Sequence, residues 1–231
     1  MELRRRQLLL TAGWWSMASL CANPVAASAA SAVCRPDDPL AALLDGNRLF
    51  MKAWRAAAED PSAAMQHEGL RLPCRATPGQ LLLEQHPWAT VLTCADSRVS
   101  PNWIFNTTPG DLFVIRSAGN TAFAEAIASI EYSVSVLNSP LVMVMGHTGC
   151  GAVAAAMQDN ALTPSLEQLV APIRKQIGGS DDPIAAVRAN ARGSAALLRQ
   201  RSNIVRNAED RGALKLVRSC FDLTSGAVTL I

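Results

Sequence analysis

The chain has 231 residues, 49% of them hydrophobic and 17% charged, so it can bury the core of one ordinary globular domain. The low charge content excludes a disordered polyelectrolyte, and an aromatic content of 5% argues against a stacking surface for nucleic acid. The formal net charge of +2 comes from residues 1–32, and residues 33–231 are formally neutral. We therefore expect no nucleic-acid partner.

Residues 1–32 have the order of an export signal. Three consecutive arginines precede an apolar run from Leu8 to about Ala22, and a stretch of small residues follows. The run is shorter than the roughly 20 residues of a membrane span, which favours a cleaved signal peptide without stable membrane association afterwards. The paired arginines resemble a twin-arginine signal, which predicts a periplasmic or otherwise exported protein. The mature protein is then a single domain, 33–231.

Hydrophobic spacing predicts an α/β domain in which parallel strands alternate with crossover helices. Apolar residues three or four apart, with Pro39 in the first turn, predict a helix over 39–59. Strands alternate with helical stretches beyond it, a pattern typical of parallel strands with helical crossovers. The predicted strands are 89–94, 111–116 and 140–146, with two short strands around a T-S-G turn at the end of the chain. The further predicted helices are 121–137, 150–158, 164–177 and 183–200.

The six cysteines do not form the regular framework of a disulfide-stabilised protein, and a chain of this length needs none. Cys34 and Cys74 flank the first predicted helix, and two possibilities stay open for them: a disulfide in an oxidising compartment, or free thiols. Cys94 and Cys150 differ from the others because of the motifs around them.

Cys94 ends the first predicted strand in C-A-D-S-R, and His147 and Cys150 follow the third in G-H-T-G-C-G-A. Sites in parallel sheets gather at the carboxyl ends of strands, so these side chains should meet. Two thiolates and an imidazole suit one tetrahedral zinc ion, and three protein ligands leave a position for water, as in catalytic sites. Each piece alone is weak, because a lone cysteine is usually a small hydrophobe. Asp96 and Arg98 alternate with Cys94 and should point the same way.

These motifs resemble the β-class carbonic anhydrases over nearly the whole of 33–231. The resemblance is carried by L-L-D-G-N-R-L-F at 43–50, Q-H-P-W-A-T-V-L-T-C-A-D-S-R-V at 85–99, P-G-D-L-F-V-I-R-S-A-G-N at 109–120, S-I-E-Y-S-V at 129–134 and G-H-T-G-C-G-A-V at 146–153. It implies that family's fold, which is a central, mostly parallel β-sheet flanked by helices with an N-terminal helical arm. It also implies a homodimer or higher homo-oligomer.

The resemblance also implies an activity: the reversible hydration of carbon dioxide to bicarbonate and a proton by attack of zinc-bound hydroxide. Its residue roles carry over to matching positions. The implied zinc ligands are Cys94, His147 and Cys150, the implied catalytic pair is Asp96 and Arg98, and the implied substrate-binding residues are Gln85 and Gly151. Two thiolates weaken zinc as a Lewis acid, so help is needed from an Asp96 carboxylate that Arg98 holds in a fork of donors.

Two other functions are compatible with the same motifs. One is a hydrolase for carbonyl sulfide or carbon disulfide, which are linear like carbon dioxide. The other is a catalytically silent zinc-binding module, against which the Asp96 and Arg98 pair argues because structural zinc needs neither. Without the resemblance, Gln85 would be interpreted as a solvated turn residue.

Overall fold

The computed structural model describes residues 35–60, 62 and 76–231. The predicted export signal at 1–32, together with Cys34 and Cys74, lies outside the described residues, so these predictions stay open. Within the described part of the chain, no helix is both long and apolar enough to cross a membrane.

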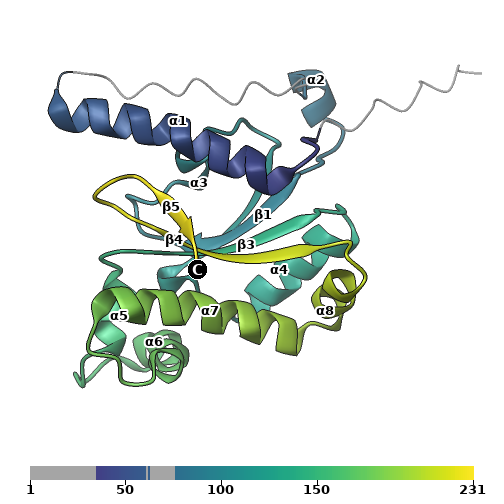
Figure 1. Ribbon diagram of the computed structural model, residues 1–231. Helices are drawn as coiled ribbons and strands as arrows, with labels where there is room; N and C mark the ends of the chain where they lie inside the picture. Colours follow the sequence, from purple (N-terminus) through teal and green to yellow (C-terminus); the bar gives the residue numbers. More distant parts are fainter. Residues whose placement is uncertain (1–34, 61, 63–75) are drawn as a thin grey trace, which may run out of the picture. The chain divides into compact units, whose positions relative to one another are not determined.

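A five-stranded sheet forms the centre of the domain (Figure 1). Its strands are β1 (Ala89–Cys94), β2 (Leu112–Ser117), β3 (Leu141–His147), β4 (Lys215–Phe221) and β5 (Val228–Leu230). They lie in the order β2-β1-β3-β4-β5; the first four are parallel, and β5 pairs antiparallel with β4 at the edge. The predicted mostly parallel sheet is confirmed. Every residue of β1 and β3 is buried, as expected for parallel strands covered on both faces.

The helices are α1 (Pro39–Glu59), α2 (Pro78–Leu81), α3 (Pro101–Ile104), α4 (Ala124–Ser135), α5 (Gly151–Ala156), α6 (Pro164–Ile177), α7 (Pro183–Arg201) and α8 (Asn203–Asp210), with a 3₁₀ turn, η1 (Ala118–Asn120), before α4. Three of the long helices begin alike, with a capping side chain followed by proline. The caps are Asp38 for α1, Thr163 for α6 and Asp182 for α7. Each cap accepts a backbone hydrogen bond, and the fixed φ of proline suits the first helical turn.

Along the strands, the side chains alternate between two apolar layers, one on each face of the sheet. Val91 and Met143 point toward α1, whereas Leu92 and Val144 point toward α4, α7 and α8. This period of two is the strand geometry expected from the sequence. Helices therefore cover both faces, and the polar ends of the strands are left as the place for chemistry.

The helix α1 packs on the sheet of its own chain. Its Asn47 side chain donates to the carbonyl oxygen of Gly226 at 2.9 Å and accepts from the backbone amide of Val228 at 2.8 Å. Gly46 allows a close approach, since a Cβ there would lie 1.8 Å from the carbonyl oxygen of Phe105. The predicted N-terminal helix is thus firmly docked at one end of the β4–β5 hairpin.

The chain leaves β1 and β3 toward opposite faces of the sheet. After β1 it passes through α3, whose Ile104 packs in the α1 layer. After β3 it passes through α5 and α6 to α7, whose Ala191 packs in the other layer. Neighbouring parallel strands with diverging connections form a switch point, where a crevice opens beyond their carboxyl ends. Cys94 and His147 end these two strands.

Candidate metal site

The three predicted metal donors meet at this switch point. Cys94 is the last residue of β1, His147 is the last residue of β3, and Cys150 is the N-cap of α5. Their donor atoms all lie within 4.8 Å of one another. All three side chains are buried, and His147 is 0% exposed.

The geometry of the donors fits zinc. At a Zn–S distance of about 2.3 Å, two sulfurs on a tetrahedral ion lie roughly 3.8 Å apart, and the sulfurs of Cys94 and Cys150 are 3.9 Å apart. The Nδ1–H of His147 donates to the carbonyl oxygen of Thr148 at 3.0 Å, which leaves the Nε2 lone pair as the ligand. That Nε2 is buried and has no hydrogen-bond partner in the protein. A metal ion is the natural partner for such an atom.

The pKa values of the two thiols are shifted in opposite directions. Hydrogen bonding with Cys150 lowers the pKa of the Cys94 thiol, burial raises it, and the nearby His147 ring and two backbone amides lower it further. Hydrogen bonding with Cys94, followed by burial, raises the pKa of Cys150. Two thiolates this close would repel each other. A dication between them removes the repulsion and favours two thiolates.

Asp96 lies beside the donors in the grip of Arg98. The guanidinium of Arg98 donates from Nε to Oδ1 at 2.9 Å and from Nη2 to Oδ2 at 2.6 Å. These bonds hold the pKa of the Asp96 carboxyl well below its usual range, against a smaller effect of burial. Oδ2 of Asp96 lies 3.9 Å from Nε2 of His147. Arg98 also donates to the carbonyl oxygen of Gly149 at 3.2 Å, so it ties together the loops that follow β1 and β3.

Arg116 is a positioning residue that the motifs did not reveal. It lies on β2, and its Nε donates to the carbonyl oxygen of Cys94 at 3.0 Å. Its Nη2 donates to the carbonyl oxygens of Asp96 at 2.7 Å and Val99 at 2.8 Å. One guanidinium therefore fixes the loop that carries both a metal donor and the carboxylate. A charged residue near the end of the apolar run D-L-F-V-I-R was the available signal.

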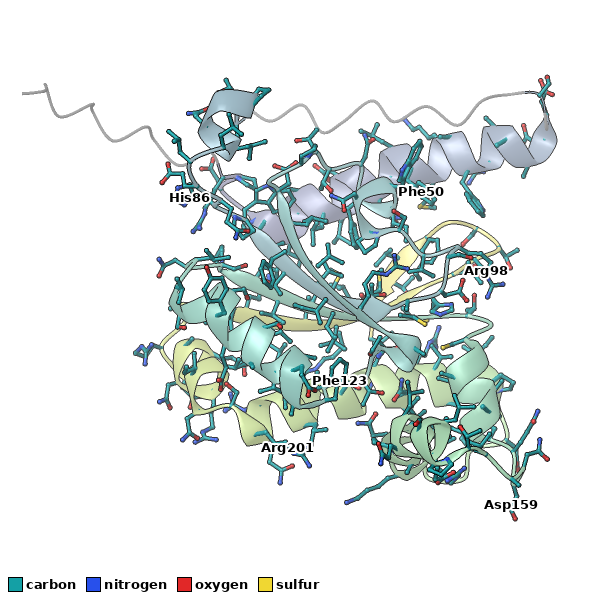
Figure 2. All side chains as sticks on the ribbon, turned by 180° about the vertical axis from the view of Figure 1, so that it is seen from behind. Phe50, His86, Arg98, Phe123, Asp159 and Arg201 are labelled. Atoms are coloured by element: carbon teal, nitrogen blue, oxygen red, sulfur yellow. The ribbon has the colours of Figure 1, made fainter. Side chains whose placement is uncertain are left out.

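The two predicted substrate-binding residues lie in different places. Gly151 is the first residue of α5, directly after Cys150, and the space where its Cβ would lie is open for at least 4 Å. Gln85 precedes β1, whereas Cys94 ends it, and a six-residue strand spans roughly 20 Å. Figure 2 shows His86 and Arg98 at opposite ends of the sheet. A single chain thus brings Gly151 close to the donors but not Gln85, and both roles stay predictions.

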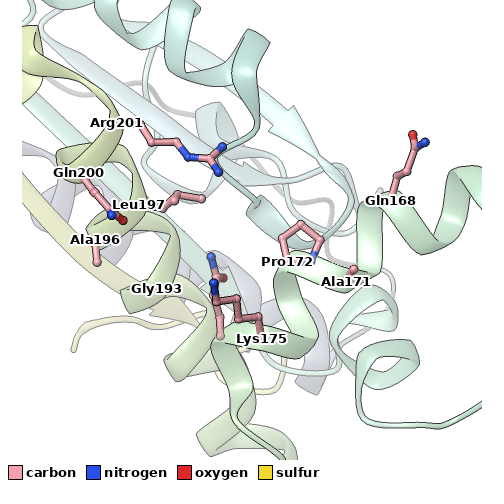
Figure 3. A pocket seen from close by; sticks show the side chains of 10 residues that line it. Gln168, Ala171, Pro172, Lys175, Gly193, Ala196, Leu197, Gln200 and Arg201 are labelled. Atoms are coloured by element: carbon pink, nitrogen blue, oxygen red, sulfur yellow. The ribbon is translucent and has the colours of Figure 1, made fainter.

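A hollow of about 610 Å³ lies elsewhere, between α6 and α7 (Figure 3). Its lining comes from those two helices and includes Lys175 and Arg201, with apolar side chains such as Leu197 between them. It contains none of the metal donors. The chemistry of the buried donors, rather than the size of a hollow, therefore identifies the site.

The sheet and its donors together define an α/β metalloprotein whose site has three protein ligands. A family model described as "Carbonic anhydrase" matches residues 89–228, which include all three donors. The chain therefore belongs to the carbonic anhydrase family. The metal of this family is zinc, which agrees with the fit of the donors.

Similar proteins agree with this assignment. The "Carbonic anhydrase 2" of Mycobacterium tuberculosis is 40% identical over 116 residues, which are 50% of each chain. The "Carbonic anhydrase" of Mycolicibacterium smegmatis is 34% identical over 157 residues, or 63% of this chain and 75% of that one. The solved β-carbonic anhydrase of Coccomyxa, in complex with acetazolamide, is 25% identical with a TM-score of 0.60, covering 85% of this chain and 87% of that chain. This chain spans about half the length of the M. tuberculosis relative.

Proposed function

We propose that the protein catalyses the reversible hydration of carbon dioxide to bicarbonate and a proton. The observation that carries the proposal is the convergence of three metal donors beside an ionised carboxylate, with Oδ2 of Asp96 3.9 Å from Nε2 of His147. The names of the relatives from M. tuberculosis and M. smegmatis support the same activity.

A zinc ion held by these donors supplies Lewis acidity that makes water a nucleophile near neutral pH. The Asp96 carboxylate can only accept hydrogen bonds while it is ionised, and Arg98 keeps it so. Asp96 therefore accepts a hydrogen bond from the attacking water and turns a lone pair of that water toward the carbon of the substrate. Arg98 contributes by fixing the carboxylate in one orientation.

The same pair argues against a silent zinc-binding module. Structural zinc sites are closed by four protein ligands, whereas the donor group found among the described residues has three members. The nearest carboxylate, Asp96, is occupied by Arg98 rather than free to close the site. A site left open next to an oriented acceptor suits catalysis.

The Asp96→Asn variant tests the proposal. We expect unchanged zinc content and a rate of oxygen-18 exchange between carbon dioxide and water that falls roughly 100-fold, because an oriented acceptor is lost. Asp45→Asn is the matched control, since Asp45 is an exposed aspartate on α1 that likewise pairs with an arginine, Arg48. A wild-type rate for Asp96→Asn would refute the role of Asp96. Zinc-loaded wild-type protein with no exchange activity, or with faster turnover of carbonyl sulfide, would refute the proposed reaction.

We further propose that the protein acts as a homodimer or higher homo-oligomer in which a second copy supplies Gln85. The position of Gln85 supports this, because a residue at the amino end of β1 reaches the donors only on another chain. Leu82 and Leu83, just before Gln85, are each 86% exposed. Adjacent leucines that face solvent are typical of a surface that another protein covers. In a symmetric dimer, each copy would supply its own Gln85 to the site of the other copy.

Mixing two defective variants tests this arrangement. Gln85→Ala lacks the amide and His147→Ala lacks the metal, but a mixed pair of the two contains one complete site. We expect the re-associated mixture to be more active than the sum of the separate samples. A mixture that forms mixed pairs, verified by mass, yet shows only the summed activity would refute a Gln85 shared between copies.

We also propose that residues 1–32 direct export by the twin-arginine route to the periplasm or beyond. The paired arginines and the short apolar run support it. Export of a folded, zinc-loaded domain would protect the Cys94 and Cys150 thiolates from oxidation. The mature N-terminal residue, and the fate of the protein in cells without twin-arginine transport, test this. Full export without that transporter would refute the route.

A further inference from the structure

Asn190 is a buried polar residue in the middle of α7. The helix buries mainly small and apolar neighbours there: Ala186, Val187, Ala191, Ala195 and Leu198. Asn190 is 0% exposed, and its Nδ2 donates to the carbonyl oxygen of Gly119 at 2.6 Å. Its Oδ1 has no hydrogen-bond partner in the protein. Burying an amide with one unpaired end is unfavourable, so packing alone does not account for this residue.

The residue that Asn190 holds has an unusual backbone. Gly119 has a φ of +79°, and Asn120 follows with a φ of +47°, so two consecutive residues are left-handed. Glycine and asparagine tolerate this region better than other residues do. A Cβ on Gly119 would lie 2.5 Å from Cδ1 of Ile173. Asn190 Nδ2 also lies 3.4 Å from Oδ1 of Asn120. One side chain of α7 thus contacts both residues of this strained turn.

The other polar group of Gly119 points at the metal site. Its backbone N–H donates to Sγ of Cys94 at 3.3 Å. Cys94 receives a second amide hydrogen from Asp96 at 3.4 Å, but that bond lies within its own loop. The bond from Gly119 instead depends on another part of the fold. Gly119 therefore links the Asn190 side chain, through its carbonyl, to the Cys94 sulfur, through its amide.

We propose that Asn190 is a positioning residue that tunes the Cys94 thiolate as a metal ligand. By holding the carbonyl of Gly119, it keeps the left-handed turn in place and aims the Gly119 amide at the sulfur. A hydrogen bond withdraws charge from a thiolate, so the metal that this thiolate holds keeps more of its positive charge. In a site with two thiolates, that withdrawal offsets part of their charge donation. The inference rests on the proposed metal site.

The cobalt(II)-substituted protein tests this inference without an activity assay. Thiolate-to-cobalt charge transfer gives a near-ultraviolet band whose energy reports the charge on sulfur. For Asn190→Ala we expect a shifted band, because the sulfur keeps more of its charge. We also expect a zinc dissociation constant raised roughly 10-fold in chelator competition, because the turn no longer holds the sulfur in position. Asn190→Ser, which keeps a polar group too short to reach Gly119, should shift the band in the same direction and serves if the alanine variant does not fold.

Ser194→Ala is the matched control. Ser194 is buried one turn further along α7, and its hydroxyl donates to Oε1 of Gln176 rather than toward the metal site. We expect this variant to lose some stability but to keep the wild-type band and zinc affinity. Folded Asn190 variants with an unchanged band and affinity would overturn the inference. Wild-type protein that shows no thiolate-to-cobalt band would instead overturn the metal site itself, so the two failures are distinguishable.

Discussion

The two ends of β1 differ: within one chain, the residues at its carboxyl end form a metal site, whereas those at its amino end do not. At the carboxyl end, Cys94 meets its two fellow donors, and the loop beyond it is fixed by Arg98 and Arg116. At the amino end, Gln85 follows two leucines that face solvent. Cys94 at the end of β1 thus contributes to the metal site of its own chain, whereas Gln85, before β1, would contribute to the site of another copy in the proposed oligomer. We expect changes at the carboxyl end to abolish catalytic activity and changes at the amino end to weaken the association of copies.

The largest effect is expected at the metal site, from His147→Ala. Removing one of three donors should leave no stoichiometric zinc, and activity should fall at least ~1,000-fold because the metal chemistry is lost. Metal analysis of the purified protein measures this. His86→Ala is the matched control at the other end of β1, where His86 pairs with Glu84, and its zinc content should stay at one per chain. Full zinc in His147→Ala would contradict the site.

Arg116→Ala should cause the next largest effect. Three loop carbonyl oxygens lose a charged donor, and we expect a loss of about 3 kcal/mol in the free energy of unfolding, measured with urea. Arg116→Lys keeps the charge but not the planar fork of donors, so its free energy of unfolding should lie between those of Arg116→Ala and the wild type. A loss below about 1 kcal/mol for Arg116→Ala would show that the loop keeps its shape without this guanidinium.

Changes near the amino end of β1 should affect the association of copies. Replacing both Leu82 and Leu83 by serine removes apolar area from the proposed contact between copies, and we expect the dissociation constant of the oligomer to rise at least roughly 10-fold. Sedimentation at several concentrations measures this. Leu166→Ser is the control, because Leu166 is an exposed leucine on α6. An unchanged dissociation constant for the double variant would place the contact elsewhere.

The smallest effect concerns Asp222, which follows β4. Hydrogen bonds from the Ser225 hydroxyl, and then from Thr224 and Thr148, lower the pKa of its carboxyl. A lowered pKa means that ionised Asp222 stabilises the folded state above its unfolded pKa of about 3.9 and that this contribution is lost as the pH falls further. Asp222→Asn should therefore cost about 1 kcal/mol at pH 7, since the group is partly exposed.

Below pH 4 the difference between Asp222→Asn and the wild type should shrink, which urea unfolding at pH 7 and pH 3.5 measures. Asp37→Asn, at an exposed position, should show little difference at either pH. A difference that stays constant with pH would mean that Asp222 acts through shape rather than charge.

The sequence predicted the elements that carry their own local signals. The helix α6 and the strand β1 have the predicted bounds, because a threonine cap and a proline start the one and a short apolar run defines the other. The strands β2 and β3 are shifted by a single residue from the predicted ranges. Ser202 caps α8 by accepting from the amide of Val205, a signal that could have revealed this short, unpredicted helix.

Other features depend on contacts between distant residues. The helix α4 begins at Ala124 rather than at 121, because the backbone is still extended at Thr121 and Phe123. The three donors were predictable, because motifs at the ends of strands carry them. The roles of Arg116 and Asn190 were not, since each acts on backbone groups of another element, and sequence spacing does not record such pairs.

The convergence of Cys94 and Cys150 on one site has a consequence for biosynthesis. Cys94 and Cys150 are 56 positions apart, so a growing chain has one sulfur of the pair long before the other. Cys94 ends β1 and His147 ends β3, so the donors come together where these two strands pair. We therefore expect zinc capture to follow the pairing of β1 and β3. A fluorescent zinc chelator, displaced only when the ion is taken up, would time this step during refolding.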